Sequence, residues 1–237
     1  MCSRHRKTMR KLFIGNKNYS SWSLRPWVLM RALCIPFEEV LVPFDGVDNY
    51  QRFKAFAPNG RVPCLEDDQG VVWDSMAITE VLAEDHPEVW PIDRAARRFA
   101  RAAAAEMHSG FQSLRSACPM ICSATFSMFA IPDGLSRELT RLDEIFSEGI
   151  VQFGGPYLAG REFTAVDASF VPVAIRVIHY GLPVSKQSRD YCNQSLKMPA
   201  VVEWLDAAIQ EPWFDLEEET AARRFANLLE DVRPLTR

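Results

Sequence analysis

Two residue pairs in the first third of the chain have the types and spacing to bind a ligand. Val62-Pro63 precedes a short apolar run. An X-Pro bond beside a strand is a candidate for the cis form, in which the N–H and C=O of Val62 would turn outward and pair with an extended peptide. Asp74-Ser75 stands before an apolar run and offers a hydroxyl, free amides and the positive end of a helix dipole, which suit a carboxylate. Each pair alone is common at strand edges or helix caps, but together they predict a short peptide ligand that bears a carboxylate.

The elements that would position these pairs alternate between strand-like and helical stretches. We expect strands at Lys11–Ile14, Glu38–Pro43, Cys64–Glu66 and Val71–Trp73, and helices at Leu24–Leu33, around Tyr50–Phe56 and at Ser75–Glu84. Strand-helix-strand followed by helix-strand-strand-helix is the order of a thioredoxin-like α/β domain. This domain is expected over residues 11–86, and a proline-rich linker over residues 87–93 follows it.

Beyond the linker, residues 94–237 are expected to form an all-α domain. Apolar residues recur at three-to-four spacing from Arg94 to about Ala117, as in one long amphipathic helix, and a second helix is expected at Leu135–Val151. Thr164 and Asp167 form a capping box, with Asp in place of Glu, before a buried helix. Residues 216–237 leave two alternatives open, an amphipathic helix or a frayed end.

Composition fits a globular protein and argues against several other classes. The 237 residues are 48% hydrophobic and can bury a substantial core, but no apolar stretch approaches the roughly 20 residues of a membrane span. A net charge of −4 without a basic stripe argues against nucleic acid as a partner. Six cysteines with no CxxC pair and no metal-ligand spacing predict a cytoplasmic protein without a metal. Residues 1–10 are basic but lack the apolar region of a secretory signal, so we expect a disordered extension, and Met9 is an alternative start.

The Val-Pro and Asp-Ser pairs follow a serine-rich helix entrance in the sequence. In this order, they resemble the glutathione-binding half of glutathione S-transferases. The resemblance covers about residues 11–213 and is closest to bacterial, serine-type members and to the zeta class of the cytosolic superfamily. It implies an α/β thioredoxin-like domain followed by an all-α domain. It also implies that Val62 and Pro63 clamp the cysteinyl backbone of glutathione, while Asp74 and Ser75 hold its γ-glutamyl end.

The same resemblance assigns a residue to the glutathione thiol. Aligned from the end of the first helix, Ser20 falls on the first serine of the zeta-class Ser-Ser-Cys-Ser run, which touches the sulfur. Ser20 is therefore the predicted thiol-activating residue. An alignment shifted by two residues would place Asn18 there, and Ser21 is the third choice. No cysteine lies between Asn18 and Ser23, where the omega and beta classes carry one, so glutaredoxin-like thiol transfer is the weaker interpretation.

Two residues of the expected helical domain are candidates for the pocket of the second substrate. His108 interrupts the apolar face of the expected long helix, and a histidine on the matching helix contacts glutathione in beta-class relatives. Arg115, further along that helix, is a candidate ligand for an anionic substrate. A core or surface histidine and an exposed arginine are the alternatives.

The resemblance implies a homodimeric detoxification enzyme that joins the glutathione thiolate to a small electrophile, with glutathione as co-substrate. A glutathione-dependent cis-trans isomerase of the maleylacetoacetate type is the first alternative. Trp22 departs from it, because the zeta class has cysteine at this position. The second alternative is a transferase-like binding protein without turnover, since a fold does not fix a function.

Overall fold

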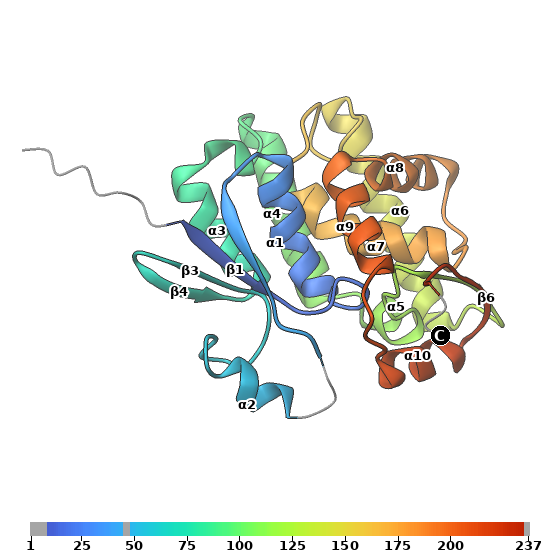
Figure 1. Ribbon diagram of the computed structural model, residues 1–237. Coiled ribbons are helices and arrows are strands. Elements are labelled where there is room, and N and C mark those ends of the chain that lie inside the picture. Colours follow the sequence, from blue (N-terminus) through green and yellow to red (C-terminus); the bar gives the residue numbers. More distant parts are fainter. Residues whose placement is uncertain (1–8, 45–47, 235–237) are drawn as a thin grey trace, which may run out of the picture.

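The computed structural model describes residues 9–44 and 48–234 (Figure 1). Most of the expected extension 1–10 lies outside these residues. Its last residue does not extend freely, because Arg10 begins the first strand and its guanidinium pairs with Asp85 at 2.6 Å.

All seven expected elements of the N-terminal part are present. In chain order they are β1 (Arg10–Ile14), α1 (Ser21–Ala32), β2 (Phe37–Leu41), α2 (Asn49–Phe53), β3 (Cys64–Asp67), β4 (Gly70–Trp73) and α3 (Ser75–Asp85). Helix α1 begins at Ser21 rather than at Leu24, because the side chain of Ser20 caps it and accepts a hydrogen bond from the backbone N–H of Ser23. The serine-rich stretch Ser20–Ser23 therefore forms the N-cap and first turn of α1.

The four strands form one mixed sheet in the order β2-β1-β3-β4. Strand β1 pairs parallel with β2 and antiparallel with β3, and β3 pairs antiparallel with β4. Alternation along β1 buries Leu12 and Ile14 completely, while Phe13, between them, stacks on Phe56 with 4.4 Å between ring centroids. Helices α1 and α3 pack against the sheet, and α2 stands apart from both (Figure 1). The thioredoxin-like α/β prediction is confirmed.

The C-terminal part is mainly helical. Its elements are a 3₁₀ turn at Pro87–Val89, α4 (Arg94–Ser109), α5 (Gln112–Ala117), β5 (Ala124–Met128), α6 (Asp133–Phe153), α7 (Ala165–His179), α8 (Lys186–Leu196), α9 (Pro199–Ile209), α10 (Leu216–Arg223) and β6 (Ala226–Asp231). No helix among the described residues is long and apolar enough to cross a membrane. The domain limits 11–86, 87–93 and 94–237 stay predictions.

The expected long helix from Arg94 to Ala117 is two helices. Helix α4 ends at Ser109, and Phe111 adopts a left-handed backbone conformation with φ of 59° before α5 begins. At Gly110 the chain folds so closely over the last turn that a Cβ atom there would lie 2.8 Å from the carbonyl oxygen of Glu106. The apolar periodicity continues through this break, which is why the sequence predicted one helix.

The C-terminal part is helical, as predicted, but it also contains a two-stranded antiparallel sheet of β5 and β6, which the sequence did not predict. In this sheet Ala124 pairs with Asp231 and Met128 pairs with Ala226. Residues 216–237, predicted as either a helix or a frayed end, contain both helix α10 and strand β6, and residues 235–237 lie outside the described chain. Strand β6 returns the end of the chain to the segment that follows α5 (Figure 1).

Helix α1 joins the two parts of the molecule, since it packs against α7 and α9 as well as against α3. Trp27 of α1 meets Trp204 of α9 edge to face, with 5.2 Å between ring centroids. The indole of Trp204 donates to the backbone oxygen of Lys17, at 2.9 Å. Contacts from the C-terminal part therefore fix the entrance of α1.

The predicted capping box at the start of α7 is present. Asp167 is fully buried and accepts hydrogen bonds from the backbone N–H of Thr164, the backbone N–H of Leu158 and the hydroxyl of Tyr191, at 3.0, 3.0 and 3.1 Å. Burial raises the pKa of Asp167 to about 6 despite these bonds, which act in the opposite direction. The box is structural, as predicted.

Candidate active site

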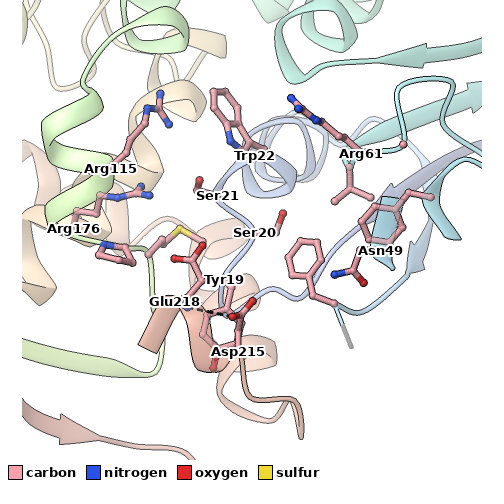
Figure 2. Close-up of a pocket in the computed structure, with 16 residues that line it drawn as sticks. Tyr19, Ser20, Ser21, Trp22, Asn49, Arg61, Arg115, Arg176, Asp215 and Glu218 are labelled. Atoms are coloured by element: carbon pink, nitrogen blue, oxygen red, sulfur yellow. Dashed lines mark hydrogen bonds between the residues drawn. The ribbon is translucent and has the colours of Figure 1, made fainter. Parts of the chain in front are cut away.

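A cavity of about 390 Å³ opens at the N-terminus of α1, between the two parts of the chain (Figure 2). Residues of the N-terminal part line one side, namely Tyr19–Trp22, Phe44, Asn49, Phe53 and Gly60–Val62. Residues of the C-terminal part line the other, namely Arg115, Pro119, Met120, Arg176, Asp215 and Glu218. A ligand in this cavity would touch both parts.

Both Ser20 and Ser21 line the cavity, on different sides of it. Ser20 lies on the side of Asn49 and Arg61, whereas Ser21 lies on the side of Arg115 (Figure 2). The hydroxyl of Ser20 is 2.7 Å from that of Ser23, and the oxygen of Ser23 accepts the backbone N–H of Gly15 at 3.1 Å. Ser20 therefore stands at the open end of a short hydrogen-bonded chain, and Ser23 is a supporting residue that the sequence did not single out.

Asn18, the other alternate for thiol activation, does not line the cavity. It is fully buried, and its side-chain oxygen accepts the backbone N–H of Ser123 at 2.9 Å. Its own N–H donates to Glu211 at 3.1 Å. These bonds tie the loop before α1 to the C-terminal part, so the geometry favours the serines over Asn18.

The predicted backbone site at Val62-Pro63 faces the cavity. The Val62–Pro63 peptide bond is cis, as expected. Val62 lines the cavity, and Pro63 is buried behind it. Among the described residues, the backbone of Val62 has no hydrogen-bond partner, so its N–H and C=O can pair with a ligand.

Asp74, Ser75 and His108 form a second cluster, next to the cavity. Asp74 caps α3 through the N–H of Met76 at 2.8 Å, and its other carboxylate oxygen lies 3.3 Å from Nε2 of His108. The ring of His108 meets Trp22, a cavity residue, with 5.2 Å between ring centroids. Trp22 is therefore the link between the predicted γ-glutamyl site and the cavity.

This arrangement corrects the placement of His108. The sequence grouped it with Arg115 in the second-substrate pocket, on one continuous helix. The chain break at Gly110 puts His108 on α4 and Arg115 on α5, so that His108 joins Asp74 whereas Arg115 lines the cavity. The two residues thus face different sites.

Two further cavity residues were missed by the sequence analysis, and Tyr19 is the first. Its hydroxyl donates to Glu219 at 3.1 Å and accepts from Arg233 at 2.8 Å, and burial raises its pKa to about 12. A phenol held in this way positions the neighbouring chain and does not act as a proton donor in catalysis. The partners come from the end of the chain, some 200 residues away, and no local pattern announces them.

Arg176 is the second missed residue. It lies in the last turn of α7 among buried apolar side chains, with only 4% of its surface exposed, and it lines the cavity beside Arg115 (Figure 2). Burial lowers the pKa of both arginines, that of Arg115 to about 10. The one signal in the sequence was a lone arginine within the apolar run of this helix.

Comparison with known proteins agrees with this architecture. Residues 19–85 match the family model of the glutathione S-transferase N-terminal domain. A probable maleylacetoacetate isomerase of Caenorhabditis elegans is 28% identical over 177 residues, 70% of this chain and 81% of the relative. Glutathione S-transferase GstB of Escherichia coli K12 is 32% identical over 90 residues, 36% of this chain and 43% of the relative. A glutathione transferase homolog from Burkholderia gl BGR1, solved with bound glutathione, has a TM-score of 0.62 at 22% identity, covering 84% of this chain and 98% of that one.

A thioredoxin-like sheet with a cis Val-Pro bond, joined to a helical part across a cavity at the N-terminus of the first helix, defines the glutathione S-transferase fold. The family model places its N-terminal domain within the first part of the chain. The chain therefore has the fold of the glutathione S-transferases, as the resemblance in sequence implied, and residues 19–85 match the model of their N-terminal domain.

Proposed function

We propose that this protein is a glutathione transferase that adds the thiolate of glutathione to a small electrophile. The observation that carries the proposal is the position of Ser20, which shares one cavity with the unpaired backbone of Val62. The cysteinyl backbone of glutathione would pair with Val62 and bring its sulfur to Ser20. The γ-glutamyl end would pass Trp22 to Asp74 and Ser75, where the N-terminus of α3 favours a carboxylate.

Ser20 would act by stabilising the thiolate, not by removing its proton as a base. In the structure its hydroxyl donates to that of Ser23. Hydroxyl hydrogens rotate, and Ser23 already accepts the N–H of Gly15, so Ser23 can donate to Ser20 instead. Ser20 is then free to donate to the sulfur. The positive end of α1 adds a smaller contribution, because Ser20 is the N-cap residue of that helix.

Isomerisation of a cis double bond is a second candidate, favoured by the likeness to the probable maleylacetoacetate isomerase of C. elegans. In such a reaction the thiolate adds to the substrate and leaves again, so glutathione is not consumed. Measuring thiol loss during turnover separates the two reactions. A binding protein without turnover would show neither thiol loss nor product. We also propose that the protein acts as a homodimer in the cytoplasm.

Titration calorimetry with glutathione tests the proposal directly. We expect saturable binding that Ser75→Ala weakens by about 1–3 kcal/mol, because a carboxylate would lose a hydrogen-bond donor. Ser136→Ala is the matched control, since Ser136 is exposed on α6, away from the cavity. Absence of binding at millimolar glutathione would overturn the transferase proposal.

A further inference from the structure

Three arginines lie in or next to the cavity wall. The guanidinium groups of Arg25 and Arg115 lie over the ring of Trp22, and Arg176 lines the cavity with Arg115. Arg25 and Arg176 are buried, and Arg115 is half-buried. Among the described residues, no carboxylate oxygen lies within 4.0 Å of any of the three. Charged side chains inside proteins are normally paired, because an unpaired buried charge is costly. This wall therefore carries positive charge that the chain itself does not pair.

Arg176 is the more buried of the two arginines that line the cavity. Its Nε donates to the backbone oxygen of Cys118 at 2.7 Å, and its Nη1 donates to that of Pro172 at 3.0 Å. Both acceptors are neutral. The remaining nitrogen, Nη2, has no hydrogen-bond partner among the described residues, and Arg176 lines the cavity. The guanidinium is thus held rigidly from behind with one donor group left for a ligand.

Arg115 is held in the same manner beside it. Its Nε donates to the oxygen of Gly110 at 3.1 Å and its Nη2 to that of Met107 at 2.6 Å. The guanidinium lies 4.6 Å from the ring centroid of Trp22, which fixes the plane of the group. Arg115 and Arg176 repel each other, and this repulsion adds to burial in lowering the pKa of Arg115.

Arg25 adds to the same unpaired charge from behind Trp22. Its carbon Cζ lies 4.1 Å from the ring centroid, and both terminal nitrogens are buried without a partner. Two acids, Asp215 and Glu218, also line the cavity, and neither forms an ion pair within 4.0 Å with an arginine, although Glu218 and Arg176 attract each other at longer range. Asp215 instead caps α10. The cavity therefore has arginines on one wall and two acids at its edge, an asymmetry that would orient a charged ligand.

We propose that the electrophilic substrate carries a carboxylate, and that Arg176 and Arg115 bind it. The inference rests on the proposed function and adds the chemical class of the second substrate. Guanidinium groups suit a planar carboxylate because they present parallel N–H donors. Both arginines belong to the C-terminal part, on the side of the cavity away from Val62. This position leaves the Val62 side to glutathione.

The test compares two chloronitroarenes that differ only in a carboxylate para to the chlorine, 1-chloro-2,6-dinitrobenzene and 4-chloro-3,5-dinitrobenzoate. In both, the thiolate sulfur forms a bond to carbon and chloride leaves. We expect kcat/KM for the benzoate, divided by its uncatalysed rate constant, to exceed that of the neutral compound at least about tenfold. Arg176→Met and Arg115→Met should each lower this ratio by roughly 10- to 100-fold. Arg137→Met, on an exposed position of α6, is the matched control and should leave the ratio unchanged.

Direct binding keeps the proposal falsifiable when a variant loses activity or fails to fold. Calorimetry with benzoate on folded Arg176→Lys and Arg115→Met should show affinity at least tenfold weaker than for the unchanged chain, with and without saturating glutathione. If both variants bind benzoate as tightly as the unchanged chain does, the proposal is overturned. Loss of benzoate binding when glutathione saturates the unchanged chain would assign the arginines to a carboxylate of glutathione itself and would also overturn it. Benzoate binding without any glutathione binding would instead refute only the transferase function.

Discussion

Replacing Ser20 with alanine should raise the pKa of the bound glutathione thiol by about one to two units. A hydrogen bond to a charged acceptor contributes about 1.5–3 kcal/mol, and one pKa unit corresponds to about 1.4 kcal/mol. An unperturbed thiol has a pKa near 8.5, so the loss of this bond would leave most of the bound thiol protonated at neutral pH. Turnover at neutral pH should fall accordingly, whereas glutathione affinity should change little.

The hydrogen-bonded chain behind Ser20 makes the prediction sharper. Ser23→Ala leaves the hydroxyl of Ser20 in place but removes the donor that frees it, so we expect a smaller rise, up to about one unit. Ser21→Ala is the matched control, because Ser21 lies beside Arg115 on the other side of the cavity (Figure 2). The measurement is the ultraviolet absorbance of the bound thiolate, titrated over pH for each variant.

The pattern across the three variants decides between the candidates. A rise in Ser21→Ala without one in Ser20→Ala would make Ser21 the activating residue and would refute the argument from position. An equal rise in Ser20→Ala and Ser23→Ala would show that the pair acts as one unit. No rise in any variant would mean that the helix terminus and the nearby arginines stabilise the thiolate, and that no hydroxyl is required.

Three further outcomes are expected. Arg233→Ala should lower the free energy of unfolding by about 3–5 kcal/mol in urea titrations, because buried Glu219 loses its ionic partner and keeps only the hydrogen bond from Tyr19. Adding Glu219→Gln should restore part of this free energy, and no loss in Arg233→Ala would show that the ion pair is not needed. Asp167→Asn should lower the free energy of unfolding by about 1–3 kcal/mol, because an amide group cannot accept from both backbone N–H donors. Burial raises the pKa of Asp167 to about 6 from its usual 3.8, so the contribution of its protonation to stability is complete below about pH 4 and is lost as pH rises through about 6. A variant whose stability has the same pH dependence as that of the unchanged chain would contradict this. Sedimentation at micromolar concentration should show a two-fold homodimer, and a monomer would refute that proposal.

The features that were predicted correctly all have local causes. The sheet strands follow from short apolar runs, and their observed limits differ little from the expected ones. The cis bond at Val62-Pro63 and the capping box at Thr164 and Asp167 are each specified by residues adjacent or three apart. Ser20 and Val62 then share a cavity, as the resemblance implied. These motifs thus located one side of the candidate site.

The features that were missed depend on contacts between distant residues or on the backbone. Gly110 breaks the long helix although apolar periodicity continues past it, and the break moves His108 away from Arg115. Strand β6 forms only because β5, about a hundred residues earlier, offers it an edge. Arg176 lies in an apolar helix, and only the fold reveals that its guanidinium reaches the cavity.

The position of Ser20 depends on the C-terminal part, although Ser20 itself belongs to the N-terminal one. Both residues before it are held from across the molecule. Ser123 and Glu211 bind Asn18, while Glu219 and Arg233 bind the hydroxyl of Tyr19. Strand β6 and the residues around it therefore set where the N-cap of α1 lies relative to Val62. A hydrogen bond to sulfur depends steeply on distance and angle. These contacts from the C-terminal part therefore affect the proposed chemistry of Ser20 as well as the stability of the fold.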